Sequence, residues 1–243
     1  MKYTSIKILS ALLFAILLSA CTSTSVEKSG KHLFILSGQS NMTGGLKKGF
    51  TSSVNKAFGT ENVTVIISMK SGRGLRFWVK DYQYAGLKLS TKRNASNGQE
   101  YPKLLKAAKD GLQQEKFDSV SFIWMQGESD ANRKELCSVY AVNFNKLYNK
   151  LKTDLNLEKL YFVMGRISHY GLMKTTKNYT PERAAQWKDV RRAQVKVAEA
   201  HSHGAWIDTD DLIDQTNLHY LGNKQSILGE RFAAKAIELI HTK

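Results

Sequence analysis

The stretch LFILSGQSNMTGG, from Leu33 to Gly45, places four consecutive apolar residues before a small, polar segment. The apolar run predicts a buried β-strand, and Gly38 permits a sharp turn at its end. Ser40 lies inside that turn. A serine after a strand is commonly a helix cap, but a strand-to-helix turn also suits a catalytic nucleophile. The rest of the chain has to decide between these two hypotheses.

Four further apolar, β-branched runs follow the first one. Each is nearly continuous rather than alternating, which is typical of strands buried on both faces of a parallel sheet. The five expected strands begin at His32, Val63, Ser119, Leu160 and Gly204. Helical patterns cover 101–116, 131–155, 181–201 and 226–241, and the polar segment 83–99 predicts a surface loop. This alternation predicts an α/β fold with a mostly parallel, doubly wound, five-stranded sheet between two layers of helices.

Three polar, glycine-containing clusters follow the first three expected strands. They are SGQSN at 37–41, SGRG at 71–74 and QGESD at 126–130. In open parallel sheets, ligands bind outside the carboxyl ends of the strands. We therefore expect all three clusters at one edge of the sheet, where a functional site would form.

A serine nucleophile needs a base within hydrogen-bond reach and donors for the developing oxyanion. The backbone N–H groups of Ser40 and Gly72 and the side-chain amide of Gln126 are candidate donors. Of the six histidines, His219 is the best placed base, because it lies in a loop between the fifth strand and the last helix. His201 and His203 precede the fifth strand and belong at the opposite end of the sheet.

The first twenty residues have the features of an export signal. Lys2 and Lys7 precede a mostly apolar run, and LLSAC at 17–21 resembles the bacterial lipobox, in which Cys21 becomes the lipidated first residue. We expect a signal peptide at 1–20, a flexible tether at 21–31 and one catalytic domain at 32–243. The expected location is exported and lipid-anchored, at the periplasmic face or outer membrane of a bacterium, and Thr22 mildly favours the outer membrane.

The formal net charge is +15, which favours an anionic partner. Nucleic acid is not expected, because the chain carries an export signal and no clustered basic helix with interleaved aromatics. Cys137 is the one cysteine left after processing, and no Cys/His cluster has metal-ligand spacing, so neither a metal nor another cofactor is expected. The sequence leaves the oligomeric state open.

Several of these segments together resemble a known family. GQSNM at 38–42, WMQGESDA at 124–131 and NLHY at 217–220 resemble three blocks of the sialate O-acetylesterases and acetylxylan esterases, and SGRGLRFWVK at 71–80 resembles another. This is carbohydrate esterase family six, a branch of the SGNH hydrolases. The resemblance runs from His32 to about Ile240. It implies a flavodoxin-like, three-layer α/β/α sandwich and removal of O-acetyl groups from a carbohydrate through an acetyl-serine.

Carried over by position, the resemblance implies roles for the residues singled out above. Ser40 is the nucleophile, and His219 is the general base and then the acid. Ser40 N–H, Gly72 N–H and the Gln126 side chain form the oxyanion hole. The chain departs from the family at Thr216, where an aspartate commonly orients the histidine. Glu128 or Asp214 is expected to supply that carboxylate, with Glu128 narrowly favoured, or else the enzyme is slow or inactive.

The substrate remains open between sialate, xylan and similar acetylated glycans. Arg73, Arg76 and Arg166 are candidates for contact with an anionic sugar, although surface ion pairs explain such residues as well. Trp78 is a candidate for stacking on a sugar, or a core residue. Two alternative functions are a general short-chain esterase or lipase of the same superfamily, and a catalytically inactive, glycan-binding lipoprotein.

Overall fold

The computed structural model describes residues 30–86, 95–214 and 217–242. Its centre is a five-stranded sheet with the order β2-β1-β3-β4-β5, in which every neighbouring pair is parallel. The strands are β1 His32–Gly38, β2 Val63–Met69, β3 Ser119–Met125, β4 Tyr161–Gly165 and β5 Gly204–Ile207. All five predicted strands are confirmed, and β4 begins one residue later than expected.

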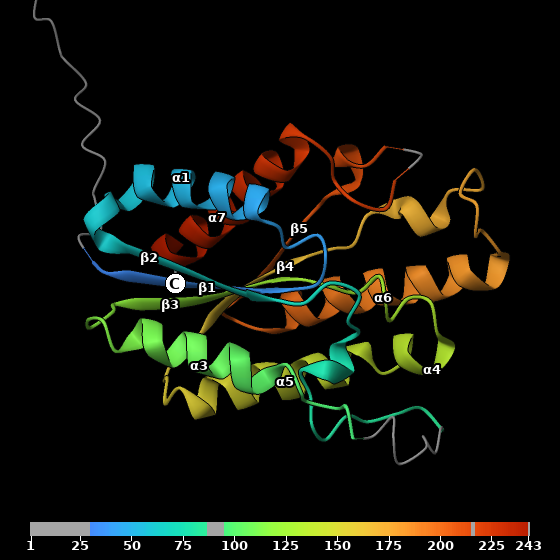
Figure 1. The fold of residues 1–243 in the computed structure, drawn as a ribbon, viewed down its shortest axis with the longest axis horizontal. Coiled ribbons are helices and arrows are strands. Elements are labelled where there is room, and N and C mark those ends of the chain that lie inside the picture. The colour runs from blue at the N-terminus through green and yellow to red at the C-terminus, as the bar shows by residue number, and fades with distance from the viewer. Residues whose placement is uncertain (1–29, 87–94, 215–216, 243) are drawn as a thin grey trace, which may run out of the picture.

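Helices cover both faces of this sheet, as predicted (Figure 1). α1 and α7 lie on one face, and α3, α5 and α6 lie on the other. The helices are α1 Gly44–Phe58, α3 Tyr101–Leu112, α4 Lys134–Cys137, α5 Tyr140–Asp154, α6 Pro181–Ala200 and α7 Asn223–Thr242. The strand order and the three layers are those of a flavodoxin-like α/β/α sandwich, which confirms the expected fold.

Two helices differ from the sequence prediction. The expected helix at 131–155 is divided into α4 and α5 at Ser138 and Val139. At this break Tyr140 turns into the core, where its hydroxyl donates to the backbone O of Gln126 at 2.8 Å. The sequence analysis did not predict α1, whose sequence contains glycine, serine and threonine, which are weak helix formers.

The local signals for α1 are nevertheless present in the sequence. Thr43 caps its first turn by accepting a hydrogen bond from Leu46 N at 3.1 Å. Its buried apolar side chains recur at helical spacing. They are Leu46, Phe50, Val54 and Phe58.

The core lies on both faces of the sheet. Every residue of β1 and β3 is buried, whereas β2 forms an edge and is partly buried along its whole length.

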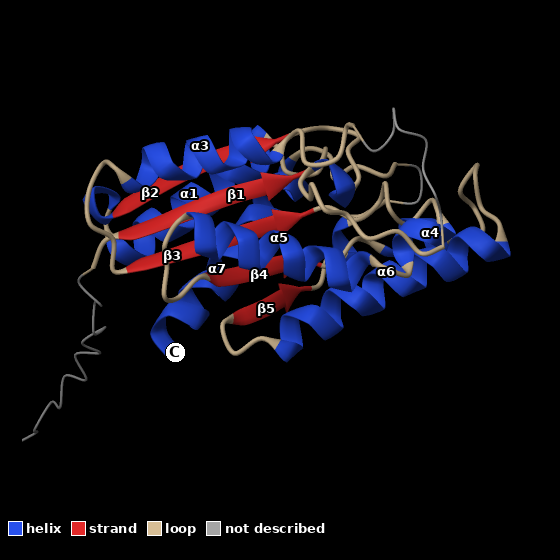
Figure 2. Ribbon diagram, turned by 90° about the horizontal axis from the view of Figure 1, so that it is seen from below, coloured by secondary structure: helices blue, strands red, loops and turns tan. Residues whose placement is uncertain are grey.

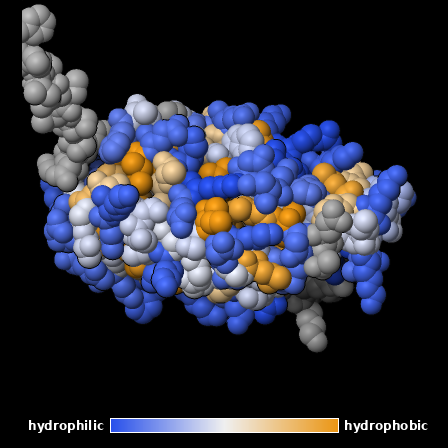
Figure 3. Space-filling view, turned by 90° about the horizontal axis from the view of Figure 1, so that it is seen from above, coloured by the Kyte–Doolittle hydropathy of each residue, from blue (hydrophilic) through white to orange (hydrophobic). Residues whose placement is uncertain are grey.

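The outer surface over α1 and α7 is mostly hydrophilic, with small apolar patches between polar side chains (Figure 3). None of the helices in the described part of the chain is long and apolar enough to cross a membrane.

All strands point the same way, so their carboxyl ends meet at one edge, where the connecting loops gather (Figure 2). The loops after β1, β2 and β3 carry the three polar clusters noted above. The order of the sheet reverses between β1 and β3, and such a switch point is where open α/β sheets bind ligands. Of the predicted loop at 83–99, residues 87–94 lie outside the described residues, as do the predicted signal peptide and Cys21.

Candidate active site

Ser40 and His219 meet at the carboxyl edge of the sheet. Nε2 of His219 lies 2.9 Å from Oγ of Ser40, although 179 residues separate them in sequence. Ser40 follows β1 directly, and His219 stands in the loop before α7. This is the serine–histidine geometry that nucleophilic catalysis requires. The structure therefore brings together the two residues that the sequence analysis paired.

The turn that presents Ser40 depends on Gly38. Its φ is +142°, and a Cβ at this position would lie 2.0 Å from the backbone O of Met125. Gly38 therefore lets β1 pass close to the end of β3, and Gln39 N donates to Met125 O at 2.9 Å. Ser40 is consequently placed by a rigid turn between two central strands.

The loop that carries His219 is held mainly by hydrogen bonds to its backbone. His219 N donates to Oδ1 of Asn217 at 2.8 Å, and Asn217 N donates to Oδ1 of Asp214 at 2.9 Å. From the other side, Oδ1 of Asn41 accepts from Tyr220 N at 3.3 Å. Sequence reasoning missed Asn41. Its position beside the candidate nucleophile, with a donor and an acceptor in one side chain, was the available signal.

The two candidate carboxylates occupy different places, and neither forms a hydrogen bond with the His219 ring. Glu128 is 2% exposed, and its Oε1 accepts from Asn41 Nδ2 at 2.7 Å. Burial raises the pKa of Glu128, against the lowering effect of backbone hydrogen bonds and of Asn41. Asp214 instead supports the turn at Asn217. Among the described residues, Nδ1 of His219 has no partner, and Thr216 lies outside them.

A pocket of about 320 Å³ surrounds the Ser40–His219 pair. Gly72 contributes an exposed backbone with φ +68°, and no atom lies within 4 Å of the position that a Cβ would take. Gly72 therefore lies in the same pocket as the serine, without a side chain to block access to its backbone. The lining residues are Gln39, Ser40, Ser71, Gly72, Glu128, Ser129, Asn132, Leu218 and His219.

Gln126, the expected third oxyanion donor, is not among the residues that line this pocket. The residue is 0% exposed. Its Nε2 donates to Oδ2 of Asp130 at 2.6 Å and to Oε1 of Gln39 at 3.1 Å. The buried carboxylate, a strong acceptor, holds the amide away from the serine. Burial raises the pKa of Asp130 to about 6, although hydrogen bonds from Leu75 N and Gln126 oppose this shift.

Two of the expected substrate contacts are also corrected. Trp78 is 2% exposed and packs edge-to-face on Trp124 with a centroid distance of 5.2 Å, so it is a core residue. Arg166 is paired with Asp208 and Asp210 and lines a separate groove along α6. Its charge is therefore neutralised away from the Ser40 pocket.

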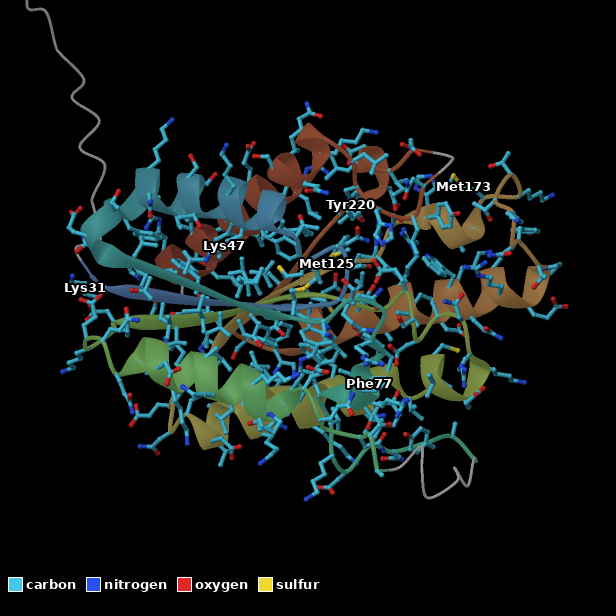
Figure 4. The ribbon with its side chains drawn as sticks, viewed as in Figure 1. Lys31, Lys47, Phe77, Met125, Met173 and Tyr220 are labelled. Atoms are coloured by element: carbon cyan, nitrogen blue, oxygen red, sulfur yellow. The ribbon has the colours of Figure 1, made fainter. Side chains whose placement is uncertain are left out.

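Arg73 does lie beside the pocket. It lines an adjoining cavity of about 270 Å³ that shares Gly72 and Ser129 with the Ser40 pocket. The guanidinium groups of Arg73 and Arg76 lie 4.5 Å and 4.0 Å from the ring centroid of Phe77. Figure 4 shows Phe77, Tyr220 and Met125 near the middle of the molecule, with Lys31 at one end. The described residues contain no group of three or more His, Cys, Asp or Glu side chains that could hold a metal ion.

Comparison with known proteins places this chain in a family. Residues 45–238 match the sequence model of the family described as carbohydrate esterase, sialic acid-specific acetylesterase. The chain therefore belongs to this carbohydrate acetylesterase family, which is a family of hydrolases. The matched range begins just after Ser40. No curated protein matches the sequence.

Solved structures show the same fold at low sequence identity. A protein from Arabidopsis thaliana superimposes with a TM-score of 0.64 at 17% identity, over 86% of this chain and 98% of that one. A carbohydrate acetylesterase from Xanthomonas citri gives 0.59 at 16% identity, over 82% of this chain, which spans 41% of the Xanthomonas protein. The structure of NanS gives 0.50 at 12% identity, over 75% of this chain and 67% of that one.

Proposed function

We propose that this protein is a serine esterase that removes O-acetyl groups from a carbohydrate through an acetyl-serine intermediate. The observation that carries the proposal is the 2.9 Å contact between Ser40 Oγ and His219 Nε2, at the carboxyl edge of the sheet. Membership of the carbohydrate acetylesterase family supports the same chemistry. Retention of a nucleophile and a base in contact argues against a protein that only binds glycans.

In the proposed mechanism, His219 removes the proton from Ser40 as Oγ attacks the acetyl carbonyl carbon. The negative charge that develops on the carbonyl oxygen is bound by the N–H groups of Ser40 and Gly72. Protonated His219 then donates its proton to the sugar oxygen as the acyl C–O bond breaks, so that the sugar departs as an alcohol and acetyl-Ser40 remains. His219 next activates a water molecule, which attacks the acetyl-serine, and acetate leaves as the proton returns to Ser40.

The cavity beside the pocket favours an acidic sugar, such as a sialate or a uronate, over neutral xylan. Arg73 and Arg133 line it, and neither side chain forms an ion pair with a described residue. Nε of Arg73 is buried without a hydrogen-bond partner among these residues. A carboxylate is the natural bidentate partner of a guanidinium. We therefore expect a higher kcat/KM for acetylated sialic acid than for acetylated xylan oligomers, and Arg73→Ala to reduce that preference.

The proposed chemistry is tested by the hydrolysis of p-nitrophenyl acetate by the purified domain. Ser40→Ala is expected to lower kcat by about 10⁴-fold or more, and His219→Ala by a comparable factor, because the two side chains act as a unit. Ser52→Ala, in an exposed part of α1, is the matched control and keeps the wild-type rate. Mass spectrometry of the wild type during turnover should detect acetyl-Ser40.

The same assay separates the alternatives. A general short-chain esterase would hydrolyse p-nitrophenyl butyrate as fast as the acetate. A glycan-binding protein without activity would show the buffer rate for wild type and Ser40→Ala alike, with circular dichroism confirming that both are folded.

A further inference from the structure

A continuous chain of buried hydrogen bonds joins the ends of β1, β3 and the loop after β2. Gln39, next to Ser40, accepts from Gln126 Nε2 at 3.1 Å. The same Nε2 donates to Oδ2 of Asp130 at 2.6 Å, and this oxygen also accepts from Leu75 N at 2.9 Å. Leu75 lies three residues after Gly72. The chain therefore connects the residue before the nucleophile with the loop of the candidate oxyanion donor.

The side chains in this chain of hydrogen bonds are buried and held by further hydrogen bonds. Gln39 is 2% exposed, and Gln126 and Asp130 are 0% exposed. The backbone O of Gln126 accepts from the Tyr140 hydroxyl and from Gln194 Nε2, both at 2.8 Å. An ionised carboxylate can only accept hydrogen bonds, so Asp130 dictates which side of the Gln126 amide faces it. Oε1 of Gln126 is left without a partner among the described residues.

This chain of hydrogen bonds holds the loop at 71–75 at two points. One is Leu75 N on Asp130, and the other is the backbone O of Arg73, which accepts from Gln126 Nε2 at 3.4 Å. Gly74 lies between them, and a Cβ there would be 3.2 Å from Asp130 Oδ2. Gly72, by contrast, is exposed. The loop is thus anchored immediately after Gly72, which lines the pocket.

We propose that Gln126 and Asp130 are positioning residues, which hold the N–H of Gly72 and Ser40 at the separation that oxyanion binding requires. The proposal rests on the proposed esterase function. It differs from a direct role, in which the Gln126 amide itself donates to the oxyanion. In the positioning role, Asp130 matters as much as Gln126, although Asp130 carries no donor to the oxyanion when ionised.

A double-mutant cycle distinguishes the two roles. Gln126→Ala and Asp130→Ala are each expected to lower kcat for p-nitrophenyl acetate by about 10²-fold, the usual effect of a misplacement of about 1 Å, with little change in KM. Because both variants break one chain, the double variant should be no worse than either single one. Asp130→Asn should stay within about tenfold of wild type, since its Oδ1 still accepts from Leu75 N and Gln126.

Two outcomes would overturn the inference. If Asp130→Ala keeps kcat near wild type while Gln126→Ala loses it, Gln126 acts as the donor itself. If both variants keep kcat, the chain has no role in catalysis. A wild type at the buffer rate would instead contradict the proposed function, so the two failures are distinguishable.

Thermal unfolding midpoints separate positioning from a loss of stability. Asn143→Ala is the control, because Asn143 is a fully buried amide outside the chain that binds the backbone of Gln83. It should lower the midpoint without changing kcat. If Asp130→Ala does not fold, Gln39→Ala tests the other end of the chain. Positioning predicts a loss of kcat there, and a wild-type kcat in Gln39→Ala would contradict it.

Discussion

At the scale of single residues, the orientation of His219 departs from the usual serine triad. A triad histidine donates Nδ1–H to a carboxylate that stabilises the imidazolium. Here, apart from the contact of its ring with Ser40, His219 is held through the backbone. His219 N donates to the side chain of Asn217, and the backbone groups of the neighbouring Leu218 and Tyr220 bind the side chain of Asn41. Glu128 nevertheless lines the same pocket, and its Oε2 is buried without a partner among the described residues. Of the two candidate carboxyl groups, that of Glu128 is therefore the one that lines the pocket with His219.

This arrangement predicts that Glu128→Gln lowers kcat more than Asp214→Asn does. The first substitution replaces the carboxyl group that lines the pocket with an amide, whereas the second keeps an oxygen that can accept from Asn217 N. We expect a loss of between about 10-fold and 10⁴-fold for Glu128→Gln, the upper bound being the effect of amidating a triad aspartate, and less than about 10-fold for Asp214→Asn. The kcat values of the two variants are compared by steady-state kinetics at saturating substrate. The reverse order would identify Asp214 as the orienting carboxylate.

The sequence was sufficient to pair Ser40 with His219 and to place Gly72 beside them, because strand direction alone determines which loops share an edge. It was not sufficient for side-chain orientation. Gln126 stands at the right edge, but its amide turns to Asp130, which is four residues further along. For the same reason the sequence left two alternatives open for Trp78 and for Arg166. Their partners, Trp124 and Asp208 with Asp210, lie far away in sequence and are brought close only by the fold.

At the scale of elements, α1 and α7 connect the two halves of the site. α1 begins shortly after Ser40, and α7 begins shortly after His219. The two helices approach closely through glycines. A Cβ on Gly49 would lie 2.2 Å from the backbone O of Ser226, and one on Gly229 would lie 2.1 Å from the backbone O of Leu46. The packing of this pair therefore fixes how the serine turn stands relative to the histidine loop.

Gly49→Ala is expected to destabilise the protein, although alanine is the better helix former. The added methyl group meets backbone of α7 and forces the helices apart, which costs about 1–3 kcal/mol of unfolding free energy. Gly44→Ala is the matched control in the same helix, because no atom lies within 4 Å of its Cβ position. We expect that control to stay within about 0.5 kcal/mol of wild type. Urea unfolding measures both, and equal effects would contradict the close contact.

The elements themselves were predictable to different degrees. The strands were predicted well, because central parallel strands leave long apolar runs that turns interrupt. α1 was missed because its glycines lower the helix propensity of the segment. These glycines are needed for the close contact with α7, which the sequence does not reveal. The division of 131–155 into α4 and α5 follows from the burial of Tyr140 against Gln126, which is again a tertiary contact.

At the scale of the whole molecule, the site and the start of the described chain lie at opposite edges of the sheet. The chain enters β1 at its amino end, beside Lys31, and Ser40 follows its carboxyl end. Seven extended residues of β1 span about 23 Å between them. An anchor upstream of Lys31 would therefore attach at the edge of the sheet opposite the Ser40 pocket, which leaves the pocket open to substrate.

The lipobox-like segment that ends at Cys21 supplies the corresponding prediction. Expressed with its leader in a Gram-negative bacterium, the wild type should fractionate with membranes and incorporate a labelled fatty acid, while Cys21→Ser should do neither. Because Cys21 is remote in sequence from the Ser40 pocket, both proteins, once solubilised, should hydrolyse p-nitrophenyl acetate with the same kcat. On intact spheroplasts or outer membrane, the anchored form should still cleave soluble acetylated oligosaccharides, since the anchor would attach at the edge of the sheet opposite the pocket. Fatty-acid incorporation that survives in Cys21→Ser would contradict the anchor, and an anchored enzyme active only after solubilisation would contradict the orientation.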